Sequence, residues 1–478
     1  MEDIIIIGGG IIGSLIAYNC SKYDCNVLLI EKDNDIANKT TMANSAIIHA
    51  GYDPSDNTLK AQMNVEGARK YPRLCKDLKV DFKQIGSLVV ACNDDEIETI
   101  EKLHKQAEER GVNTKIIERD EILDLEKNIS DQVKKALYCQ QTAIVTPWKI
   151  AIAAMETAMA NQCKCELNQE VIDIIKEDDV FVVKTKENEF RAKMVINCAG
   201  LYADKINEMV THNKDFTITP RKGEYFVLSK KVREYVNHVI YPAPSKVGKG
   251  ILVVPTVHGN ILLGPNACEQ EDKEDTSTTV EGLDFVRQNI GKIVKDVPYQ
   301  EIIHSFSGLR PTCNRHDFII EESSVENFIN VAGIESPGLA SAPAIAEKVL
   351  EDFVLKKFDF AKRMFFAHRV KNIVLAEFSD EKKARYIQHN PKYGKIVCRC
   401  EQVSEQEIID CIRRNCGARS VIGVKKRVRP GMGKCQGGFC EPLVVQILAR
   451  ELGIDPTEVD YNGKNTPILR NSSKGGEK

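Results

Sequence analysis

The sequence predicts an α/β plus α+β fold with a small helical unit near its C-terminus. An apolar, β-branched run at the N-terminus leads directly into a glycine-rich segment and a helix-like stretch, as in a buried parallel sheet. Residues 216–310 contain short β-rich runs broken by Gly and Pro. Four closely spaced cysteines lie between helix-like stretches near the C-terminus, and they indicate a separate cysteine-cluster domain.

The elements of the first region follow the order of a Rossmann-like domain. Residues 4–7 predict a buried strand, residues 14–21 a helix and residues 26–30 a second strand. Further along, charges on a helical spacing predict a solvated surface helix over 94–110. Strands are predicted within the β-rich region at 225–228, 250–254 and 261–263.

Three glycines and one acid between these elements predict a dinucleotide site. Gly8 permits a tight turn, Gly10 lets the backbone approach a pyrophosphate, and Gly13 lets the helix pack close to the strand. Glu31 follows the second strand, where a carboxylate binds a ribose hydroxyl and disfavours a 2′-phosphate. FAD and NAD share this fingerprint, so it does not separate the two cofactors.

The composition narrows the function class. The chain has 478 residues, 42% hydrophobic and 28% charged, which is enough for two or three domains. Its formal net charge of -3 gives no general attraction for nucleic acid. The sequence has no signal-peptide pattern and no apolar run of 18 residues, so we expect a cytoplasmic protein whose sixteen cysteines are mostly reduced.

The C-terminal cysteines predict a soft metal centre. Cys398 and Cys400 form a C-x-C pair, and Cys435 and Cys440 form a C-x4-C pair with glycines beside them. An iron–sulfur cluster is favoured because C-x-C spacing is unusual for structural zinc, which remains the alternative together with unliganded thiols. Such a cluster indicates electron transfer.

Two helices are predicted around these cysteines. Ser404 and Glu407 form a capping box that opens a helix over 408–414, and residues 441–452 form a helix that leaves the last ligand. Cys411 and Cys416 are expected not to be ligands. The domain is basic, which predicts either charge balance for an anionic cluster and docking of an acceptor, or simply solvated side chains; the basic residues are Arg413, Arg414, Arg419, Lys425, Lys426, Arg427, Arg429 and Lys434.

Three further segments carry a resemblance to a known family. Residues 40–51, residues 194–204 and residues 330–339 resemble the FAD-dependent oxidoreductases of the D-amino-acid-oxidase type. The chain is most similar to flavin-dependent glycerol-3-phosphate dehydrogenases and L-2-hydroxyglutarate dehydrogenases. The resemblance covers about residues 3–355.

The resemblance implies a domain organisation. The discontinuous FAD-binding domain would comprise 1–80, 140–215 and 310–360, and a mainly antiparallel-sheet substrate domain would comprise 81–139 and 216–309. A charged connector at 361–393 would lead to a [2Fe-2S]-binding domain at 394–455, followed by a tail at 456–478. The last domain resembles bacterioferritin-associated ferredoxin, in the version fused to flavin dehydrogenases, although C-x4-C replaces the C-x2-C of the stand-alone module.

The resemblance also implies which residues contact FAD and substrate. Besides the glycines and Glu31, the FAD-binding positions would be Thr41, Ser45, Ala199, Gly200, Gly333, Ser336, Gly338 and Leu339. His49 is expected near the reacting carbon or the flavin, as a base, a substrate ligand or a flavin support, and Arg310 is expected to bind a carboxylate or phosphate. Lys222 and Tyr225 are weaker candidates, since a charged residue at a turn is usually solvated.

These expectations combine into one function with alternatives. The chain would oxidise sn-glycerol 3-phosphate to dihydroxyacetone phosphate, and electrons would pass from FAD through a [2Fe-2S] cluster to a partner redox protein, such as a flavoprotein. L-2-hydroxyglutarate, proline or an opine are alternative substrates for the same chemistry. In an alternative of another class, the chain is an electron-transfer subunit and a partner performs catalysis.

Overall fold

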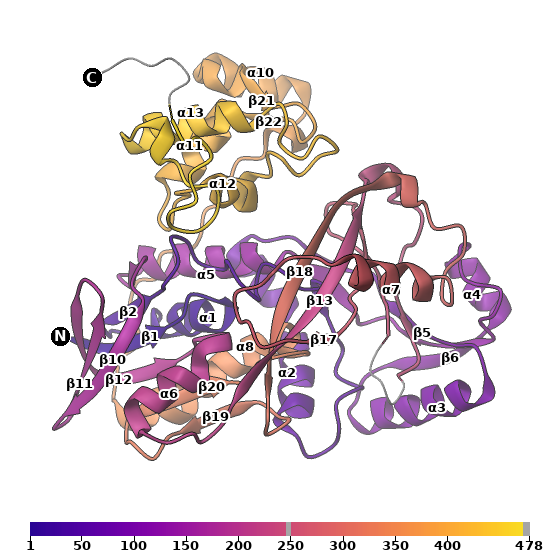
Figure 1. The fold of residues 1–478 in the computed structure, drawn as a ribbon, viewed down its shortest axis with the longest axis horizontal. Helices are drawn as coiled ribbons and strands as arrows, with labels where there is room; N and C mark the ends of the chain where they lie inside the picture. Colours follow the sequence, from indigo (N-terminus) through magenta and orange to yellow (C-terminus); the bar gives the residue numbers. More distant parts are fainter. Residues whose placement is uncertain (245–249, 472–478) are drawn as a thin grey trace.

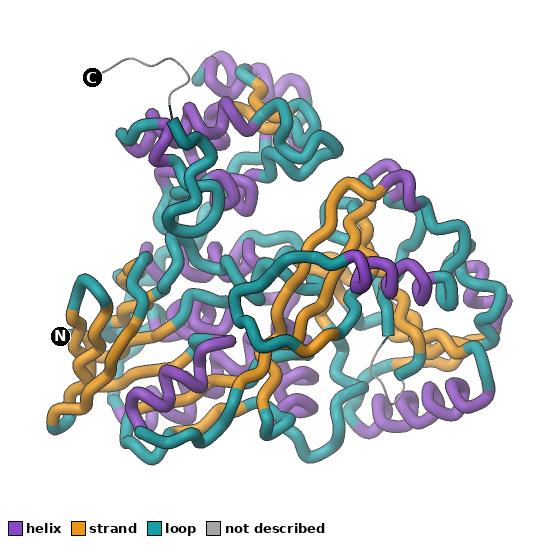
Figure 2. Tube along the Cα trace, in the orientation of Figure 1, coloured by secondary structure: helices purple, strands orange, loops and turns teal. Residues whose placement is uncertain are grey.

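A computed structural model describes residues 1–244 and 250–471. The chain forms a large body with two main sheets, and a C-terminal domain lies above helix α5 (Pro147–Ala160) of that body (Figure 1). Figure 2 shows strands concentrated in the body, whereas the C-terminal domain consists mostly of helices and loops. Among the described residues, no helix is long and apolar enough to cross a membrane.

The first sheet confirms the predicted dinucleotide-binding topology. Its central strand β1 (Glu2–Ile7) pairs in parallel with β2 (Val27–Ile30) on one side and with β12 (Glu189–Asn197) on the other. Residues Ile4–Ile7 are almost fully buried, because Ile4 and Ile6 belong to one apolar cluster and Ile5 and Ile7 to another, on opposite faces of the strand. The remaining strands are β9 (Lys164–Glu166), β10 (Val171–Glu177), β11 (Val180–Thr185), β19 (Ile319–Glu322) and β20 (Phe328–Ala332).

Helices cover this sheet and bring distant segments together. Helix α1 (Ile11–Cys20) packs against α5 and against α8 (Gly338–Val349), and α8 packs against α2 (Leu59–Leu78). Gly67 allows the last contact, because a Cβ there would lie 2.2 Å from the carbonyl oxygen of Ala340. Helix α6 (Ala203–Thr211) lies over β10 and β20.

The second sheet is mainly antiparallel, and with the first it confirms the predicted fold class. Its longest pair joins β13 (Ile218–Leu228) to β18 (Ile302–Cys313) and runs towards the C-terminal domain (Figure 1). The other strands are β5 (Ser87–Ala91), β6 (Thr114–Glu118), β7 (Lys135–Cys139), β14 (Val239–Pro242), β15 (Val253–Pro255), β16 (Ile261–Leu263) and β17 (Cys268–Glu269). A small third sheet contains β3 (Ile47–Ile48), β4 (Phe82–Gln84) and β8 (Ala143–Val145).

One helix at the edge of the second sheet is the surface helix that its charge pattern predicts. The predicted surface helix is α3 (Asp94–Glu109), capped by the Asn93 side chain and buried only at Ile100 and Ala107. Helices α4 (Arg119–Leu125) and α7 (Val280–Ile290) also belong to this part. Of the predicted strands, 261–263 is found as such, 225–228 ends β13, and 250–254 contributes only its last two residues to β15.

The C-terminal domain has its own apolar core. Helix α10 (Asp380–His389) precedes β21 (Ile396–Cys398), β22 (Val403–Ser404), α11 (Glu405–Arg413), α12 (Val421–Val428) and α13 (Glu441–Leu452). Both predicted helices are present, and the capping box of Ser404 and Glu407 is formed. The segment predicted as a tail begins by packing on this domain, because Val459 is buried in its apolar core.

Candidate active site and cluster site

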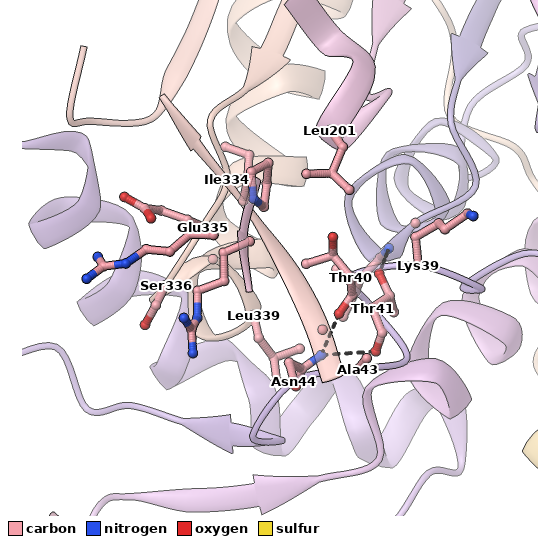
Figure 3. A pocket seen from close by; sticks show the side chains of 18 of the residues that line it. Lys39, Thr40, Thr41, Ala43, Asn44, Leu201, Ile334, Glu335, Ser336 and Leu339 are labelled. Carbon is pink, nitrogen blue, oxygen red and sulfur yellow. Dashed lines mark hydrogen bonds between the residues drawn. The ribbon is translucent and has the colours of Figure 1, made fainter. Parts of the chain in front are cut away.

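A cavity of about 940 Å³ lies where the two main sheets meet. It is lined from the first sheet by the ends of β1 and β2 and by the loop after β2, and from the second sheet by β13 and β18. A second wall comes from the loop after β20, where Ile334, Glu335, Ser336 and Leu339 lie opposite residues 39–44 (Figure 3). The volume is at the upper end for small-molecule sites, as an extended dinucleotide requires.

The glycine turn at one end of the cavity is built for close approach. Gly8 has φ +109°, and a Cβ on it would lie 2.4 Å from the carbonyl oxygen of Cys198. A Cβ on Gly13 would lie 2.1 Å from the carbonyl oxygen of Gly8, so any side chain there would push α1 away from the turn. Gly10 is the N-cap of α1 and lines the cavity, so the amides of that helix face the space where a pyrophosphate would lie.

Two polar side chains fix the walls beside this turn. The Glu31 carboxylate accepts hydrogen bonds from the backbone N–H of Gly9 at 2.7 Å and of Asp33 at 2.9 Å, and burial raises its pKa. It lines the cavity at the end of β2, where the sequence predicts a ribose ligand. Thr41 Oγ1 accepts from the N–H of Ile11 at 2.9 Å and thereby ties the loop after β2 to the start of α1.

The loop after β2 packs tightly against β18 at another part of the cavity wall. Gly308 lies against the loop after β2, since a Cβ there would be 1.9 Å from the carbonyl oxygen of Ala43. Asn44 Nδ2 donates to the carbonyl oxygens of Thr40 and Thr41, both at 3.0 Å, which holds that loop in shape (Figure 3). These residues fit the planar ring of a flavin, which needs a narrow, water-poor slot.

The remaining predicted FAD positions lie around the cavity with one exception. Ser45, Ala199, Gly200, Ser336, Gly338 and Leu339 line it. Gly333 does not line it: this residue has φ +66° and packs against Cys313, so it shapes the loop from behind.

Of the predicted substrate residues, His49, Tyr225 and Arg310 line the same cavity. The Tyr241 hydroxyl lies 3.3 Å from Nδ1 of His49, and the backbone carbonyl of His49 accepts from Asn64 at 2.7 Å. Tyr225 stacks on Phe306 with ring centroids 4.6 Å apart, and its hydroxyl lies 3.0 Å from Ser45 Oγ. The ring of His49 is therefore held from the side of the substrate sheet.

Lys222 is placed elsewhere. Its side chain is buried on the opposite face of β13 and forms an ion pair with Asp275 at 2.6 Å, and it does not line the cavity. The physical reason is strand periodicity: Lys222 and Tyr225 are three residues apart on one strand, so they point to opposite faces. Arg221, which is not among the predicted site residues, lines the cavity instead.

Arg221 and Arg310 form a cationic pair in the cavity. They are direct partners in the antiparallel register of β13 and β18. Neither guanidinium has an acidic partner among the described residues, and Arg221 Nε is buried without a hydrogen-bond acceptor there. Gly223 makes room for this arrangement, because a Cβ there would lie 2.6 Å from an Nη of Arg310. Two unneutralised cations on one wall predict an anionic ligand.

The four predicted cluster cysteines come together as two mixed pairs. Sγ of Cys400 lies 3.9 Å from Sγ of Cys435, so one cysteine of each motif is in each pair. In the other pair, the Cys440 thiol donates to Cys398 and lowers the pKa of Cys398 to about 6. Metal–sulfur bonds of about 2.3 Å place two sulfurs of one tetrahedral metal about 3.8 Å apart, so the Cys400–Cys435 separation suits one iron.

Two close pairs of thiols are the arrangement that a binuclear cluster needs. In the part of the chain that the structure describes, no group of three or more His, Cys, Asp or Glu side chains is close enough to hold a single metal ion. Two pairs fit a [2Fe-2S] cluster, in which each iron takes two thiolates. Gly433 lets its loop approach Cys400, since a Cβ there would be 2.3 Å from that residue's Cβ. Cys411 is buried in the apolar core of the domain, and Cys416 lies beside Arg427.

Comparisons with known proteins agree with both sites. The family model for FAD dependent oxidoreductases matches residues 3–351, and that for BFD-like [2Fe-2S] binding domains matches residues 396–450. A glycerol 3-phosphate dehydrogenase of Caloramator mitchellensis is 47% identical over 478 residues, which is 99% of each chain. A glycerol 3-phosphate oxidase of Mycoplasma genitalium is 33% identical over 74% of this chain and 95% of that protein. The structure of dithionite-reduced L-alpha-glycerophosphate oxidase from Mycoplasma pneumoniae with FAD bound has a TM-score of 0.72 at 30% identity, covering 76% of this chain and 97% of that one.

Proposed function

We propose, because this chain belongs to the family of FAD-dependent oxidoreductases and carries a BFD-like [2Fe-2S] binding domain, that it oxidises sn-glycerol 3-phosphate to dihydroxyacetone phosphate. The observation that carries the proposal is the pair of Arg221 and Arg310 on the cavity wall, which suits a phosphate dianion. The full-length relative that is named a glycerol 3-phosphate dehydrogenase supports the same substrate.

The cavity residues have separate roles in substrate binding and in proton transfer. Arg221 and Arg310 hold the phosphate and so fix the position of the carbon chain. His49, whose ring is oriented by the Tyr241 hydroxyl, is the group that we assign to accept the proton of the reacting hydroxyl. The stacked rings of Tyr225 and Phe306 exclude water from the same wall. Bound FAD supplies the acceptor for the two electrons and hydrogen that leave carbon, and the cluster supplies a one-electron outlet.

An anaerobic flavin titration tests this function. Glycerol 3-phosphate should bleach the flavin absorption of the purified full-length protein, with dihydroxyacetone phosphate as product. L-2-Hydroxyglutarate and L-proline serve as comparison substrates, since two arginines could also bind a carboxylate. Bleaching by one of these compounds but not by glycerol 3-phosphate would sink the assignment, and bleaching by none would favour an electron-transfer subunit.

We further propose that the acceptor is a redox protein with an acidic surface, which docks over the cluster. Phe439, next to the ligand Cys440, is 86% exposed, and Leu443 on the first turn of α13 is 45% exposed. The exposed Arg399 lies between Cys398 and Cys400. An exposed aromatic beside a cation is a common anchor for a protein partner.

A matched pair of acceptors tests the docking surface. Phe439→Ser should slow electron delivery to an acidic ferredoxin and leave reduction of a small artificial dye unchanged. Added salt should slow only the protein acceptor, because exposed charges are screened. If Phe439→Ser reduces both acceptors at the wild-type rate, this surface is not the exit.

We place the chain in the cytoplasm. The support is that all sixteen cysteines are free, as in a reducing compartment, and the four cluster ligands need thiolates rather than disulfides. Cell fractionation with antibody detection tests the location, and recovery outside the cytoplasmic fraction would contradict it.

A further inference from the structure

A buried cluster of charges joins the C-terminal domain to the body. Asp35, in the loop after β2, forms a bidentate ion pair with Arg427 of α12, at 2.7 and 2.8 Å. Lys426 adds a second cation 3.0 Å from the same carboxylate. These three side chains are at most 5% exposed, although almost 400 residues separate them in the sequence. We call Asp35, Lys426 and Arg427 the interdomain ion cluster.

Lys426 also binds the segment that forms the cavity wall. Its Nζ donates to the carbonyl oxygen of Ile36 at 2.7 Å and to Oδ1 of Asn38 at 2.5 Å. Ala37 and Asn38 line the FAD cavity, as do the next residues up to Thr41. Ala37 N–H donates to the carbonyl oxygen of Gly9 in the glycine turn, at 3.0 Å. Residues 35–41, here named the shared segment, therefore face FAD on one side and the C-terminal domain on the other.

Water cannot easily replace these contacts. Removing one member of a buried ion pair leaves a charge without a partner, which is far more costly than losing an exposed pair. Arg427 is fully engaged, since it also donates to the carbonyl oxygens of Cys416 and Gly423. A shift of α12 away from the body would therefore release the shared segment, and disorder in the shared segment would release α12.

A neighbouring hydrogen bond involves a tryptophan whose fluorescence can report docking of the C-terminal domain. Trp148 at the start of α5 donates its indole N–H to the carbonyl oxygen of Lys426 at 2.9 Å. It is the single tryptophan of the chain. A second set of contacts, Glu156 with Arg369 and Arg414, holds the connector and α11 to the same helix further along. Other ion pairs, among them Lys230 with Glu401 and Lys464 with Glu187, also join the C-terminal domain to the body. Among these contacts of the described residues, the interdomain ion cluster is the one that reaches a residue lining the FAD cavity, Asn38.

We infer that Asp35 is a positioning residue through which FAD binding and docking of the C-terminal domain stabilise each other. FAD orders the shared segment, and the ordered segment presents the acceptors that Lys426 and Arg427 need. The coupling must be reciprocal, because both events draw on the same ordered segment. The inference rests on the FAD cavity but not on the identity of the substrate.

Two variants of the full chain test the coupling. Asp35→Asn should weaken FAD binding by about 5- to 150-fold, the usual range of coupling between sites. Lys426→Met keeps the balanced pair of Asp35 and Arg427 and removes the second cation beside Asp35 together with the bonds to Ile36 and Asn38, so it should fold even if Asp35→Asn does not. It should weaken FAD binding in the same direction. FAD affinity is measured by titration of the FAD-stripped protein, without substrate.

A second readout reports docking directly. Removal of FAD from the wild type should increase amide hydrogen exchange in residues 421–428 and expose Trp148 to a quencher. A merely structural role for Asp35 would lower stability without making this exchange depend on FAD. The control is Glu451→Gln, which breaks the ion pair with Arg413 inside the C-terminal domain and should leave FAD affinity unchanged.

The results of this test do not depend on which substrate the protein oxidises. If FAD affinity in both variants equals that of the wild type and exchange in 421–428 does not respond to FAD, the coupling is refuted. Because neither measurement contains glycerol 3-phosphate, a failure of the proposed function leaves this test unaffected, and the reverse also holds.

Discussion

Replacing Arg221 by methionine isolates the contribution of the cationic pair in the cavity. Methionine keeps much of the length of arginine and removes its charge and its donors. Arg221 has no acidic partner among the described residues, so the substitution orphans no carboxylate there. The change should therefore act on the ligand and not on the fold. Arg310, its partner across β13 and β18, remains to hold the anion alone.

The expected rise in KM follows from the hydrogen bond to the phosphate that the substitution removes. A hydrogen bond to a charged group contributes about 1.5–3 kcal/mol, so KM for glycerol 3-phosphate should rise about 10- to 150-fold. Without ligand, the variant should be more stable than the wild type by up to about 1 kcal/mol, because like charges directly opposite on neighbouring strands repel. Weaker binding combined with a higher Tm is a signature that simple damage to the fold would not produce.

Steady-state kinetics with an artificial acceptor give KM, and thermal unfolding with and without inorganic phosphate gives the stability change. Phosphate should raise the Tm of the wild type more than that of Arg221→Met. Arg315→Met is the matched control, since Arg315 binds Glu321 outside the cavity and its loss should leave KM unchanged. An unchanged KM in Arg221→Met, or a lower Tm without ligand, would refute the reasoning.

Three further outcomes are expected. Gly13→Ala should abolish FAD binding, because its methyl group would meet the Gly8 carbonyl, and the purified protein should lack flavin absorption. Cys435→Ser should remove iron and labile sulfide while glycerol 3-phosphate still bleaches the flavin; zinc without sulfide in the wild type would contradict the cluster assignment. Burial alone would raise the pKa of Asp35, but Arg427 and Lys426 lower it to about 2. The contribution of Asp35 to stability should therefore be fully present above its ordinary pKa of 3.8. The protection of residues 421–428 from amide hydrogen exchange should be lost as the pH falls through about 2. Loss of that protection already at pH 5 would show that another group controls docking.

The sequence predicts local features well because their causes are local. The strand, glycine turn and helix around Gly8 and Gly13 are specified by residues within one βα unit, and the structure has them where expected. The capping box of Ser404 is likewise complete within four residues. The spacing predicts the four cysteines as one group, and the structure brings them together, but their arrangement in mixed pairs depends on how two loops fold together.

The sequence does not predict residues whose partners lie far away along the chain. Arg221 could have been found by applying the period of two to β13, since it shares a face with Tyr225 whereas Lys222 does not. Lys426 and Arg427 look like members of a solvated basic surface, yet both are buried against Asp35. Nothing in the spacing of an isolated Asp near the N-terminus indicates a partner almost 400 residues away.

The burial of Asp35 has a consequence for how this architecture can be shortened. A chain that ended before the cysteine domain would expose the shared segment and strip Asp35 of both its counter-ions. A truncated enzyme built for use with oxygen or a dye should therefore carry a neutral residue at position 35 and a replacement for the hydrogen bonds that Lys426 gives to Ile36 and Asn38. In lineages that gained or lost the domain, residues 35–38 should have changed together with it.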